Sequence, residues 1–391
     1  MGLKIGGTIE KVNGRELTYR EFADKYMAQN QPVVLKGLMD DWIACKDWVS
    51  ANGKPNLQFF STHFGKSKVQ EYPEYIVYRT PVDFSDDWLN FYLEKFHMHN
   101  DPDTYSERNE ISCSDYRFVY MGSKGTWTPL HADVFWSYSW SANVCGKKQW
   151  YFLPPSHHLV FDRNMKSSVY NIFADVSQSK FPGFEKAIWW ECTQEENEVI
   201  FVPVDGITKF IIRLLHELQE DTISINHNWF NGYNLSWVWD LLLKDYNEAS
   251  EYIEDLKGCD DFEELCQRNL AANTGINFYD FFIFIVRFAF ADVKNETSQR
   301  PSEMMQHIYF NLESIRSIAV KMRPINAGDK QGVLLDLRKN VEEVSLEVTQ
   351  ALSKYKDLMF SDFIKSQVQS SEDLVAFIDD AFTKLGGAFS R

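Results

Sequence analysis

The segment "GTWTPLHADVFWSYSWSANVCGKKQWYFLPP", residues 125–155, decides the fold. It places His131 two residues before Asp133 and then runs through short aromatic and polar stretches that Gly and Pro interrupt. On a β-strand, residues i and i+2 project to the same face. We therefore expect a strand here whose imidazole and carboxylate point together into the mouth of a β-barrel.

The sequence around this segment is typical of a β-rich region. Between residues 111 and 235 the runs "YRFVYMG", "NEVIFVP" and "DTISINHNWF" are short, aromatic and β-branched, and Gly, Pro, Asn and Asp separate them. Several short strands at this spacing are characteristic of a β-sandwich or barrel. We therefore predict a β core over residues 111–235.

Helical patterns flank this core on both sides. In residues 1–110, Thr18 stands three before Glu21, which predicts a capping box at the start of an amphipathic helix. Residues 236–391 space apolar side chains at three and four along most of their length, which predicts helices. The sequence therefore predicts an α+β chain in which residues 1–110 complete the barrel and the C-terminal helices pack on it.

Composition narrows the class of protein. The chain has 391 residues, 44% of them hydrophobic, and a net charge of −16. This balance argues against a direct nucleic-acid binder, which needs clustered Lys and Arg, and is compatible with a basic partner. Six cysteines without a C-x-x-C pair fit a reducing compartment.

Residues 278–293 form the most apolar stretch. Asp280, Arg287 and Asp292 interrupt it, and it is shorter than the roughly 20 apolar residues that a membrane-spanning helix needs. We expect a buried helix here, no membrane association, and a cytoplasmic or nuclear soluble protein.

The residue types around His131 predict metal chemistry. His131 and Asp133, with one more histidine, can form the two-His-one-carboxylate set that leaves three positions open on Fe(II). Lys148 follows seventeen residues after His131 and can pair with the distal carboxylate of a dicarboxylate cosubstrate. The hydroxyl of Thr128 can donate to the same carboxylate. The structural alternatives are a strand-end histidine beside an exposed aspartate, a hairpin lysine and a turn threonine.

Two asparagines downstream can contribute to the same site. Asn226 and Asn228 stand at i and i+2 in "DTISINHNWFNGYN". Buried amides need hydrogen-bond partners, and a bound acid would supply them. His227 lies between them and should face away from their cavity. The alternative is the edge of a polar turn.

The order of these motifs resembles a known family. "TPLHAD", "GKKQWYFLPP", "EVIFVP" and "DTISINHNWF" resemble the JmjC (jumonji) 2-oxoglutarate- and Fe(II)-dependent oxygenases, and "DTISINHNWFNGYNLSWVW" is most similar to the jumonji-domain-containing protein 4 subfamily. The resemblance implies a double-stranded β-helix (cupin-like jelly-roll) core with N-terminal helices and a C-terminal helical region. It also implies the site residues: His131 and Asp133 as catalytic iron ligands, Thr128 and Lys148 as 2-oxoglutarate contacts, and Asn226 and Asn228 facing the cosubstrate.

The resemblance implies an enzyme with a protein substrate. Such an oxygenase uses Fe(II), 2-oxoglutarate and O2, with ascorbate as reductant in an assay. The subfamily implies hydroxylation of a lysine of the translation termination release factor. One alternative is a non-catalytic binding module of the same fold that meets a basic partner through its acidic surface. Another is a lysine demethylase, which the absence of a histone-reader domain disfavours.

One stretch departs from the family pattern. In the family that this chain resembles, the strand ending "FVP" is followed by Gly, Trp and then the second iron-binding histidine. This chain instead continues "VDGITKF" from Val204. His216 is the nearest imidazole and is the candidate ligand, although it lies further along the chain inside an apolar run.

A shift of reading frame would explain the departure. One codon string encodes Val204 to Ile211 in one frame and Ser-Gly-Trp-Tyr-His-Gln-Val-His in another, with the ligand histidine where Thr208 stands. We therefore predict a one-base reading error or a misplaced splice junction within residues 204–219. The alternative is a real divergence that gives a weakened or inactive metal site.

Overall fold

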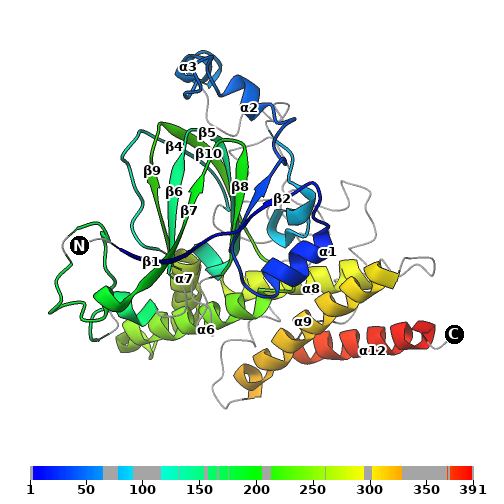
Figure 1. The fold of residues 1–391 in the computed structure, drawn as a ribbon. Coiled ribbons are helices and arrows are strands. Elements are labelled where there is room, and N and C mark those ends of the chain that lie inside the picture. Colours follow the sequence, from blue (N-terminus) through cyan, green and yellow to red (C-terminus); the bar gives the residue numbers. More distant parts are fainter. Residues whose placement is uncertain are drawn as a thin grey trace. The chain divides into compact units, whose positions relative to one another are not determined.

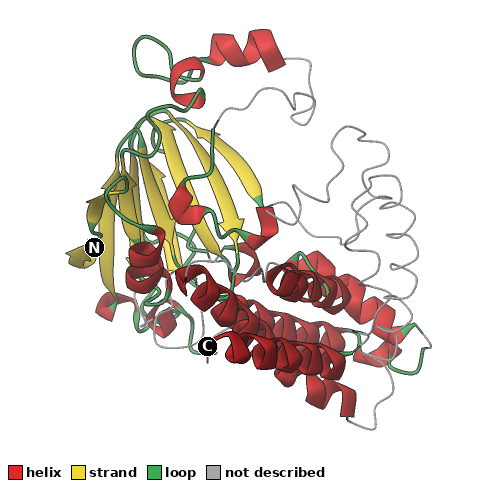
Figure 2. Cartoon of the chain, turned by 90° about the vertical axis from the view of Figure 1, so that its right-hand side faces the viewer, coloured by secondary structure: helices red, strands yellow, loops and turns green. Residues whose placement is uncertain are grey.

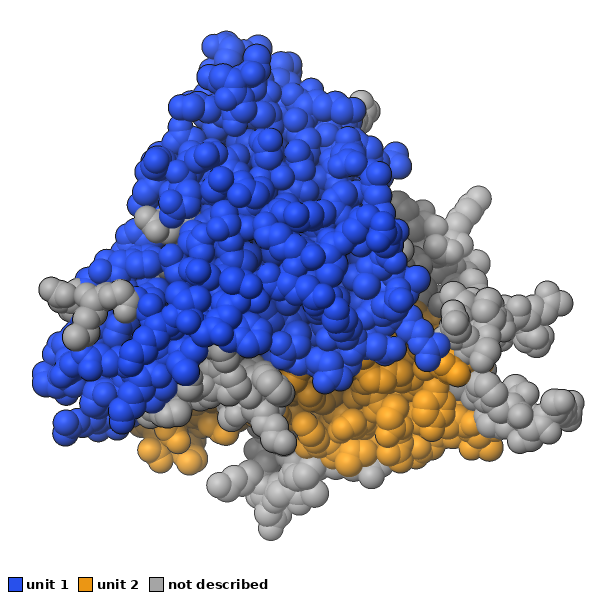
Figure 3. Space-filling model, viewed as in Figure 1, with its two compact units in different colours: residues 1–87, 115–229 blue, residues 88–114, 230–391 orange. Residues whose placement is uncertain are grey.

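The structure is a computed structural model that describes most of the chain. The described residues are 3–64, 78–90, 116–131, 133–153, 157–164, 167–174, 176–204, 213–259, 261–294, 302–327, 368 and 370–389. The chain forms two compact units, residues 1–87 with 115–229 and residues 88–114 with 230–391, coloured separately in Figure 3. The two sheets belong to the first unit, and the long C-terminal helices belong to the second.

The first unit contains two β-sheets (Figures 1 and 2). The six-stranded sheet has the order β2 (Lys11–Asn13), β3 (Val33–Lys36), β8 (Glu198–Val202), β5 (Tyr138–Cys145), β10 (Thr222–Trp229), β4 (Arg117–Gly122). The four-stranded sheet has the order β1 (Lys4–Thr8), β7 (Ile188–Gln194), β6 (Lys148–Leu153), β9 (Arg213–Leu218). From β5 to β10 the chain crosses repeatedly between the sheets, and these strands pair antiparallel. The predicted β core is confirmed.

Strand β10 shows why the six-stranded sheet has two different faces. Its alternate residues Ser224 and Asn226 face the second sheet, where Ser224 contacts Lys148 of β6. The residues between them face the other way, where His227 stacks on Trp140 of β5 at 4.4 Å between ring centroids. The period of two along the strand therefore gives one polar face and one aromatic face.

The interior between the sheets is polar at one end and apolar at the other. The apolar end is a buried cluster that both sheets supply: Ile9, Val34, Trp150, Phe152, Cys192, Ile200 and Val202. The polar end holds Lys148 and the hydroxyls of Ser141 and Ser224. The buried polar groups therefore lie apart from the apolar cluster.

Short helices cover the aromatic face of the six-stranded sheet. They include α1 (Tyr19–Phe22), the π-helical turn Ala23–Met27 and the 3₁₀ turn Val82–Phe84. The predicted capping box is confirmed, because Thr18 Oγ1 accepts from the Glu21 N–H at 3.3 Å and the Glu21 carboxylate accepts from the Thr18 N–H at 2.9 Å. Phe22 packs edge-on against Phe84 and Phe201, so burial of this ring fixes α1 on the sheet.

The remaining helices of the first unit are α2 (Ala44–Asp47), α3 (Leu57–Phe64) and the 3₁₀ turns Val134–Trp136, His157–Val160 and Phe184–Lys186. Among the residues that the structure describes, the helices of the second unit are α6 (Leu235–Tyr252), the 3₁₀ turn Glu254–Leu256, α7 (Phe262–Thr274), α8 (Phe278–Lys294), α9 (Ser302–Ala327) and α12 (Ser371–Phe389).

The second unit confirms the predicted helices for the residues described there. The apolar stretch 278–293 forms α8, and its phenylalanine side chains are buried, as predicted. Helix α12 is joined to α9 by Arg316, whose guanidinium donates to both carboxylate oxygens of Asp379. No helix among the described residues is both long and apolar enough to cross a membrane. The predicted boundaries at 110 and 235, and the predicted packing of the helices on the barrel, stay predictions.

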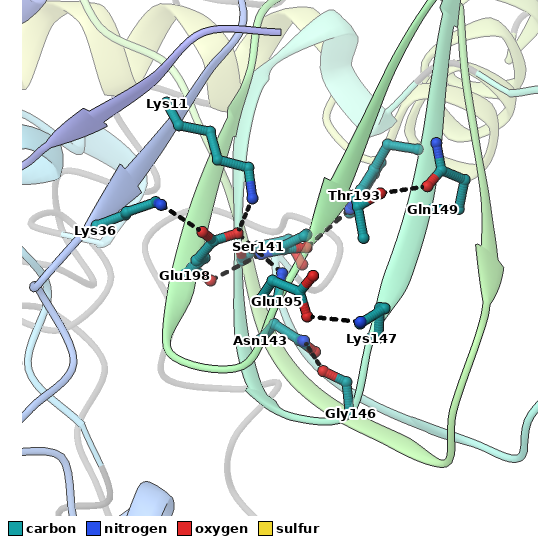
Figure 4. Close-up of polar contacts among 12 residues, drawn as sticks. Lys11, Lys36, Ser141, Asn143, Gly146, Lys147, Gln149, Thr193, Glu195 and Glu198 are labelled. Atoms are coloured by element: carbon teal, nitrogen blue, oxygen red, sulfur yellow. Dashed lines mark hydrogen bonds and ion pairs between the residues drawn. The ribbon is translucent and has the colours of Figure 1, made fainter. Parts of the chain in front are cut away.

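A buried carboxylate fastens the N-terminal strands to the core. Glu198 of β8 is buried and accepts from Lys11 Nζ of β2 at 2.6 Å, while Lys36 Nζ of β3 lies 3.5 Å away (Figure 4). The backbone N–H of Glu195 donates to the same carboxylate at 2.9 Å. One side chain therefore joins three strands.

We expect Glu198→Gln to lower the free energy of unfolding by about 1–3 kcal/mol, because a buried charged acceptor is lost opposite two ammonium groups. Urea denaturation measures this. Glu195→Gln is the control: its carboxylate pairs with Lys147 at 3.1 Å on the surface, and its loss should change stability by at most about 0.5 kcal/mol. Equal losses in the two variants would contradict the role of Glu198.

Asp83 is a buried carboxylate beneath the aromatic face. Neither of its oxygens has a hydrogen-bond partner among the described residues. Burial raises the pKa of Asp83 to about 6. The folded state therefore holds the proton that the unfolded chain has already released, so stability falls as pH rises from the unfolded pKa near 4 to about 6.

Replacing Asp83 by Asn should remove this loss. We expect the melting temperature of Asp83→Asn to exceed that of the unaltered chain, with a difference that grows as pH rises to about 6 and then stays constant. Thermal unfolding of both proteins from about pH 5 to pH 8 checks it. A difference that shrinks with rising pH would show instead that folding lowers the pKa of Asp83.

Candidate functional site

His131 and Asp133 lie together, as the sequence predicts. Their nearest atoms, Nε2 and Oδ1, are 4.0 Å apart, and the side chains are 39% and 21% exposed. The regular strand predicted around them is wrong, because residues 126–131 form only isolated bridges and a 3₁₀ turn follows at Val134–Trp136. The chain turns too soon after Asp133 to continue a strand.

Each of the two side chains is oriented by a neighbour. His131 Nδ1 lies 2.8 Å from the carbonyl oxygen of Pro129, so this nitrogen donates and Nε2 keeps its lone pair. Asp133 Oδ2 accepts from Ser139 Oγ at 2.5 Å, which leaves Oδ1 directed toward His131. A nitrogen and an oxygen lone pair therefore converge, as two adjacent ligands of a divalent metal require.

Lys148 is buried without a carboxylate partner. Its side chain is 1% exposed, and its Nζ donates to Ser224 Oγ at 2.6 Å and to Ser141 Oγ at 3.4 Å. Burial lowers its pKa to about 7. None of the ion pairs among the described residues includes Lys148. Its Nζ also lies 5.6 Å from the centre of the Trp150 ring. A buried ammonium whose described contacts are hydroxyls and an aromatic ring suits a bound anion.

The β5–β6 turn sets the register that buries Lys148. Gly146 has φ = 78°, and a Cβ there would lie 2.3 Å from the Asp221 carbonyl oxygen, so only glycine fits. Its own carbonyl accepts from Asn143 Nδ2 at 2.7 Å (Figure 4). Lys147, the residue before Lys148, faces outward and pairs with Glu195, as the sequence predicts.

Lys148 and Thr128 line one cavity of about 120 Å³. This is the space of about four water molecules, enough for a small organic acid. Other residues that line it are Tyr120, Met121, Gly122, Thr126, Trp127, Leu218 and Thr222. The structure therefore brings together the two side chains that the sequence assigns to the cosubstrate.

Tyr120 is a candidate site residue that the sequence analysis missed. It lines the cavity, and its hydroxyl has a raised pKa because of burial and, less strongly, the charge of Asp133. In the sheet it lies opposite Ser224, the partner of Lys148. Residues directly opposite on antiparallel strands share a face. The pairing of "RFVYMG" with "TISINHNW" would have identified Tyr120, but one strand alone does not give the register.

Asn226 and Asn228 lie on the polar face but not in this cavity lining. Asn226 Oδ1 accepts from Ser141 Oγ at 3.2 Å, and Asn228 Nδ2 donates to Ser137 Oγ at 3.1 Å. The partner of Asn226 therefore lies on β5, and that of Asn228 is the residue just before β5. Their predicted contact with a cosubstrate stays a prediction.

His227 faces the opposite side of the sheet, as predicted. It is buried against Trp140, its Nε2 contacts the hydroxyl of Tyr78, and its Nδ1 lies 3.8 Å from Asp87 Oδ2. Burial holds its pKa well below the usual value. His227 is therefore separated from His131 by the sheet.

The third ligand is not among the described contacts. Residues 205–212, which include Thr208 and half of the segment 204–219 predicted to hold the frame error, lie outside the described residues. His216 belongs to β9 and stands opposite Trp150 of β6 in the sheet register; its side chain also lies outside the description. Within the described ranges, no three His, Cys, Asp or Glu residues come together as a metal site.

Comparisons with known proteins agree with this geometry. The family model described as "JmjC domain, hydroxylase" matches residues 118–208, from β4 to within the departing stretch. The "Arginine-specific demethylase JMJ20" of Arabidopsis thaliana is 49% identical over 400 residues, which cover 88% of this chain and 85% of that protein.

More distant relatives carry another name. The "2-oxoglutarate and iron-dependent oxygenase JMJD4" of Danio rerio is 33% identical over 326 residues, covering 69% of this chain and 72% of that protein. The homologue of the same name in Drosophila melanogaster is 28% identical and covers 84% and 93%. The predicted resemblance is confirmed, and the chain belongs to the JmjC-domain family of 2-oxoglutarate- and iron-dependent oxygenases.

Proposed function

We propose that this chain is a protein oxygenase in which His131 and Asp133 hold Fe(II) and Lys148 holds 2-oxoglutarate. The observation that carries the proposal is the buried side chain of Lys148, which donates to Ser224 and lines a cavity with Thr128 and Tyr120. The charge of Asp133 acts on the Tyr120 hydroxyl, and Asp133 converges with His131. The printed name of the Danio rerio relative, which gives both 2-oxoglutarate and iron, supports it. A JmjC domain also favours the double-stranded β-helix core, to which the crossing of strands between the two sheets corresponds.

The described donors suit Fe(II) in type but supply two of the three ligands that the facial set needs. The third is proposed to come from residues 204–219. Two sources are open: His216 on β9, or a histidine at the position of Thr208 in a corrected reading frame.

The chain's own residues bind, orient and exclude water. Lys148 pairs with the distal carboxylate of 2-oxoglutarate. Thr128 and Tyr120 line the same cavity, and each carries a hydroxyl that can donate to this carboxylate. The side chain of Lys148 is itself 1% exposed, so its pairing with a carboxylate is shielded from water. Bound iron would supply the oxidation of a substrate C–H bond by O2, coupled to oxidation of 2-oxoglutarate to succinate and CO2.

The proposed substrate is a basic side chain of another protein. The net charge of −16 favours a basic partner. The first candidate, suggested by the resemblance to the JMJD4 proteins, is a lysine of the translation termination release factor. The name of the Arabidopsis relative favours a second candidate, the N-methyl group of arginine. Hydroxylation of that methyl carbon gives a hemiaminal, which releases formaldehyde and leaves the demethylated nitrogen.

Mass spectrometry separates the two substrates. We expect a release-factor protein incubated with the enzyme, Fe(II), ascorbate and 2-oxoglutarate to gain one oxygen atom on a lysine. A methylated arginine peptide that instead loses a methyl group, with formaldehyde released, would favour the second candidate. Absence of both products from an enzyme that forms succinate would rule out both substrates.

The departing stretch gives a direct test of the metal site. We expect the chain as printed to be folded but inactive, and replacement of residues 204–219 by Ser-Gly-Trp-Tyr-His-Gln-Val-His-Asn-Leu to restore succinate formation. A metal site with two protein ligands lacks the preorganisation of three. His131→Ala in the replaced protein should abolish turnover. Full activity of the printed chain would instead make His216 or another residue the third ligand.

Lys148 gives a second test, by calorimetry of 2-oxoglutarate binding. Lys148→Ala should weaken binding by about 2–5 kcal/mol, because a buried charge partner is removed. Lys147→Ala should have little effect, since Lys147 faces outward and pairs with Glu195. The opposite ranking would contradict the proposed role of the cavity.

The pKa of Lys148 predicts proton uptake on binding. With its pKa lowered to about 7, the side chain is mostly neutral at about pH 8, and a bound carboxylate raises the pKa. Binding should therefore take up close to one proton at about pH 8 and far less at about pH 6. Calorimetry in buffers of different ionisation enthalpy measures this uptake, which should disappear in Lys148→Ala.

A further inference from the structure

The polar face of β5 contacts both halves of the site through alternate serines. Ser139 and Ser141 are buried, stand two residues apart and share one face of the strand. Ser139 Oγ donates to Asp133 at 2.5 Å. Ser141 Oγ instead accepts from Lys148 at 3.4 Å and donates to Asn226 at 3.2 Å. Two serines of one strand therefore make separate contacts, one with the proposed metal ligand Asp133 and the other with Lys148.

Asp133 owes little of its position to regular structure. The 3₁₀ turn Val134–Trp136 follows it directly, and Phe135 and Trp136 have φ values of 62° and 46°. Such left-handed conformations are unfavourable for bulky residues and persist where the surroundings enforce them. Burial of the Phe135 ring anchors this turn. The turn brings Asp133 back onto β5, where Ser139 meets it.

We propose that Ser139 is a positioning residue for the metal carboxylate, an inference that rests on the proposed function. It is the one hydrogen-bond donor to Asp133 among the described residues. Its hydroxyl occupies Oδ2, so Oδ1 alone is directed toward His131 Nε2 at 4.0 Å. Ser139 thereby holds Asp133 as a ligand through one oxygen.

The hydrogen bond from Ser139 to Asp133 should also raise the affinity of the site for a metal ion. Without the hydroxyl, the carboxylate of Asp133 rotates more freely, and binding the metal must then order it. Loss of a hydrogen-bond partner of a metal ligand typically lowers metal affinity about 10–100-fold. Ser141 lies one step along the same face and does not contact Asp133, so its hydroxyl has no such effect.

Mn(II) is the probe in place of Fe(II). Histidine nitrogen and carboxylate oxygen bind both metals, and Mn(II) is not oxidised by air during the titration. The parent protein is the full chain with residues 204–219 replaced as above, and its titration, followed by the electron paramagnetic resonance signal of free Mn(II), gives the affinity of the parent and of each variant. We expect Ser139→Ala to bind Mn(II) about 10–100-fold more weakly than this parent. Ser141→Ala removes an equally buried hydroxyl and should keep the Mn(II) affinity, while its affinity for 2-oxoglutarate falls.

A second pair isolates the hydroxyl from the shape of the side chain. Ser139→Thr keeps the donor, whereas Ser139→Val has nearly the same shape without it, so Thr should bind Mn(II) about 10–100-fold more tightly than Val. Circular dichroism confirms that each variant is folded.

Equal Mn(II) affinity in the Thr and Val variants, or an equal loss in Ser139→Ala and Ser141→Ala, would overturn the positioning role and leave the proposed function standing. Failure of the parent protein to bind Mn(II) would overturn both.

Discussion

The alternation of polar and aromatic side chains along β5 and β10 is the constraint on which the structure depends. Along β5, Ser139 and Ser141 alternate with Tyr138 and Trp140, and β10 follows the same rule beside it. Because side chains on a strand alternate between faces, the register of a strand determines which of its residues lie on each face of the sheet. The aromatic side packs against the N-terminal helices and supplies stability. The polar side faces the second sheet and supplies the site.

Much of this could be predicted from sequence, because period two is a local signal. The burial of Lys148, the exposure of Lys147 and the outward facing of His227 all follow from counting residues along single strands. The capping box of Thr18 and Glu21 is local in the same sense. Contacts that depend on pairing between distant strands were not predictable in this way. Tyr120 belongs to this class, because its place in the cavity follows from its register with Ser224, about a hundred residues away.

The segment that bears His131 and Asp133 shows a different limit. The two side chains converge as predicted, but the regular strand expected there is replaced by an extended segment and a turn. The hydroxyl of Ser139 and the carbonyl of Pro129 orient the pair instead. Neither partner follows from periodicity, since one lies beyond a left-handed turn and the other is a backbone atom. The resemblance to the family implied that His131 and Asp133 are the ligands, but it did not identify the two hydrogen bonds that orient them.

The turn at Gly146 has a consequence for how this site can change during evolution. Glycine is required there because the Asp221 carbonyl lies close to its Cα. Of the two lysines that follow, Lys147 faces outward and Lys148 is buried. Inserting or deleting one residue between Gly146 and β6 would exchange them: Lys147 would enter the barrel or Lys148 would leave it, and the next aromatic residues would change face with them. The length of this hairpin is therefore under stronger selection than its composition, and homologues should differ here by substitution rather than by insertion or deletion.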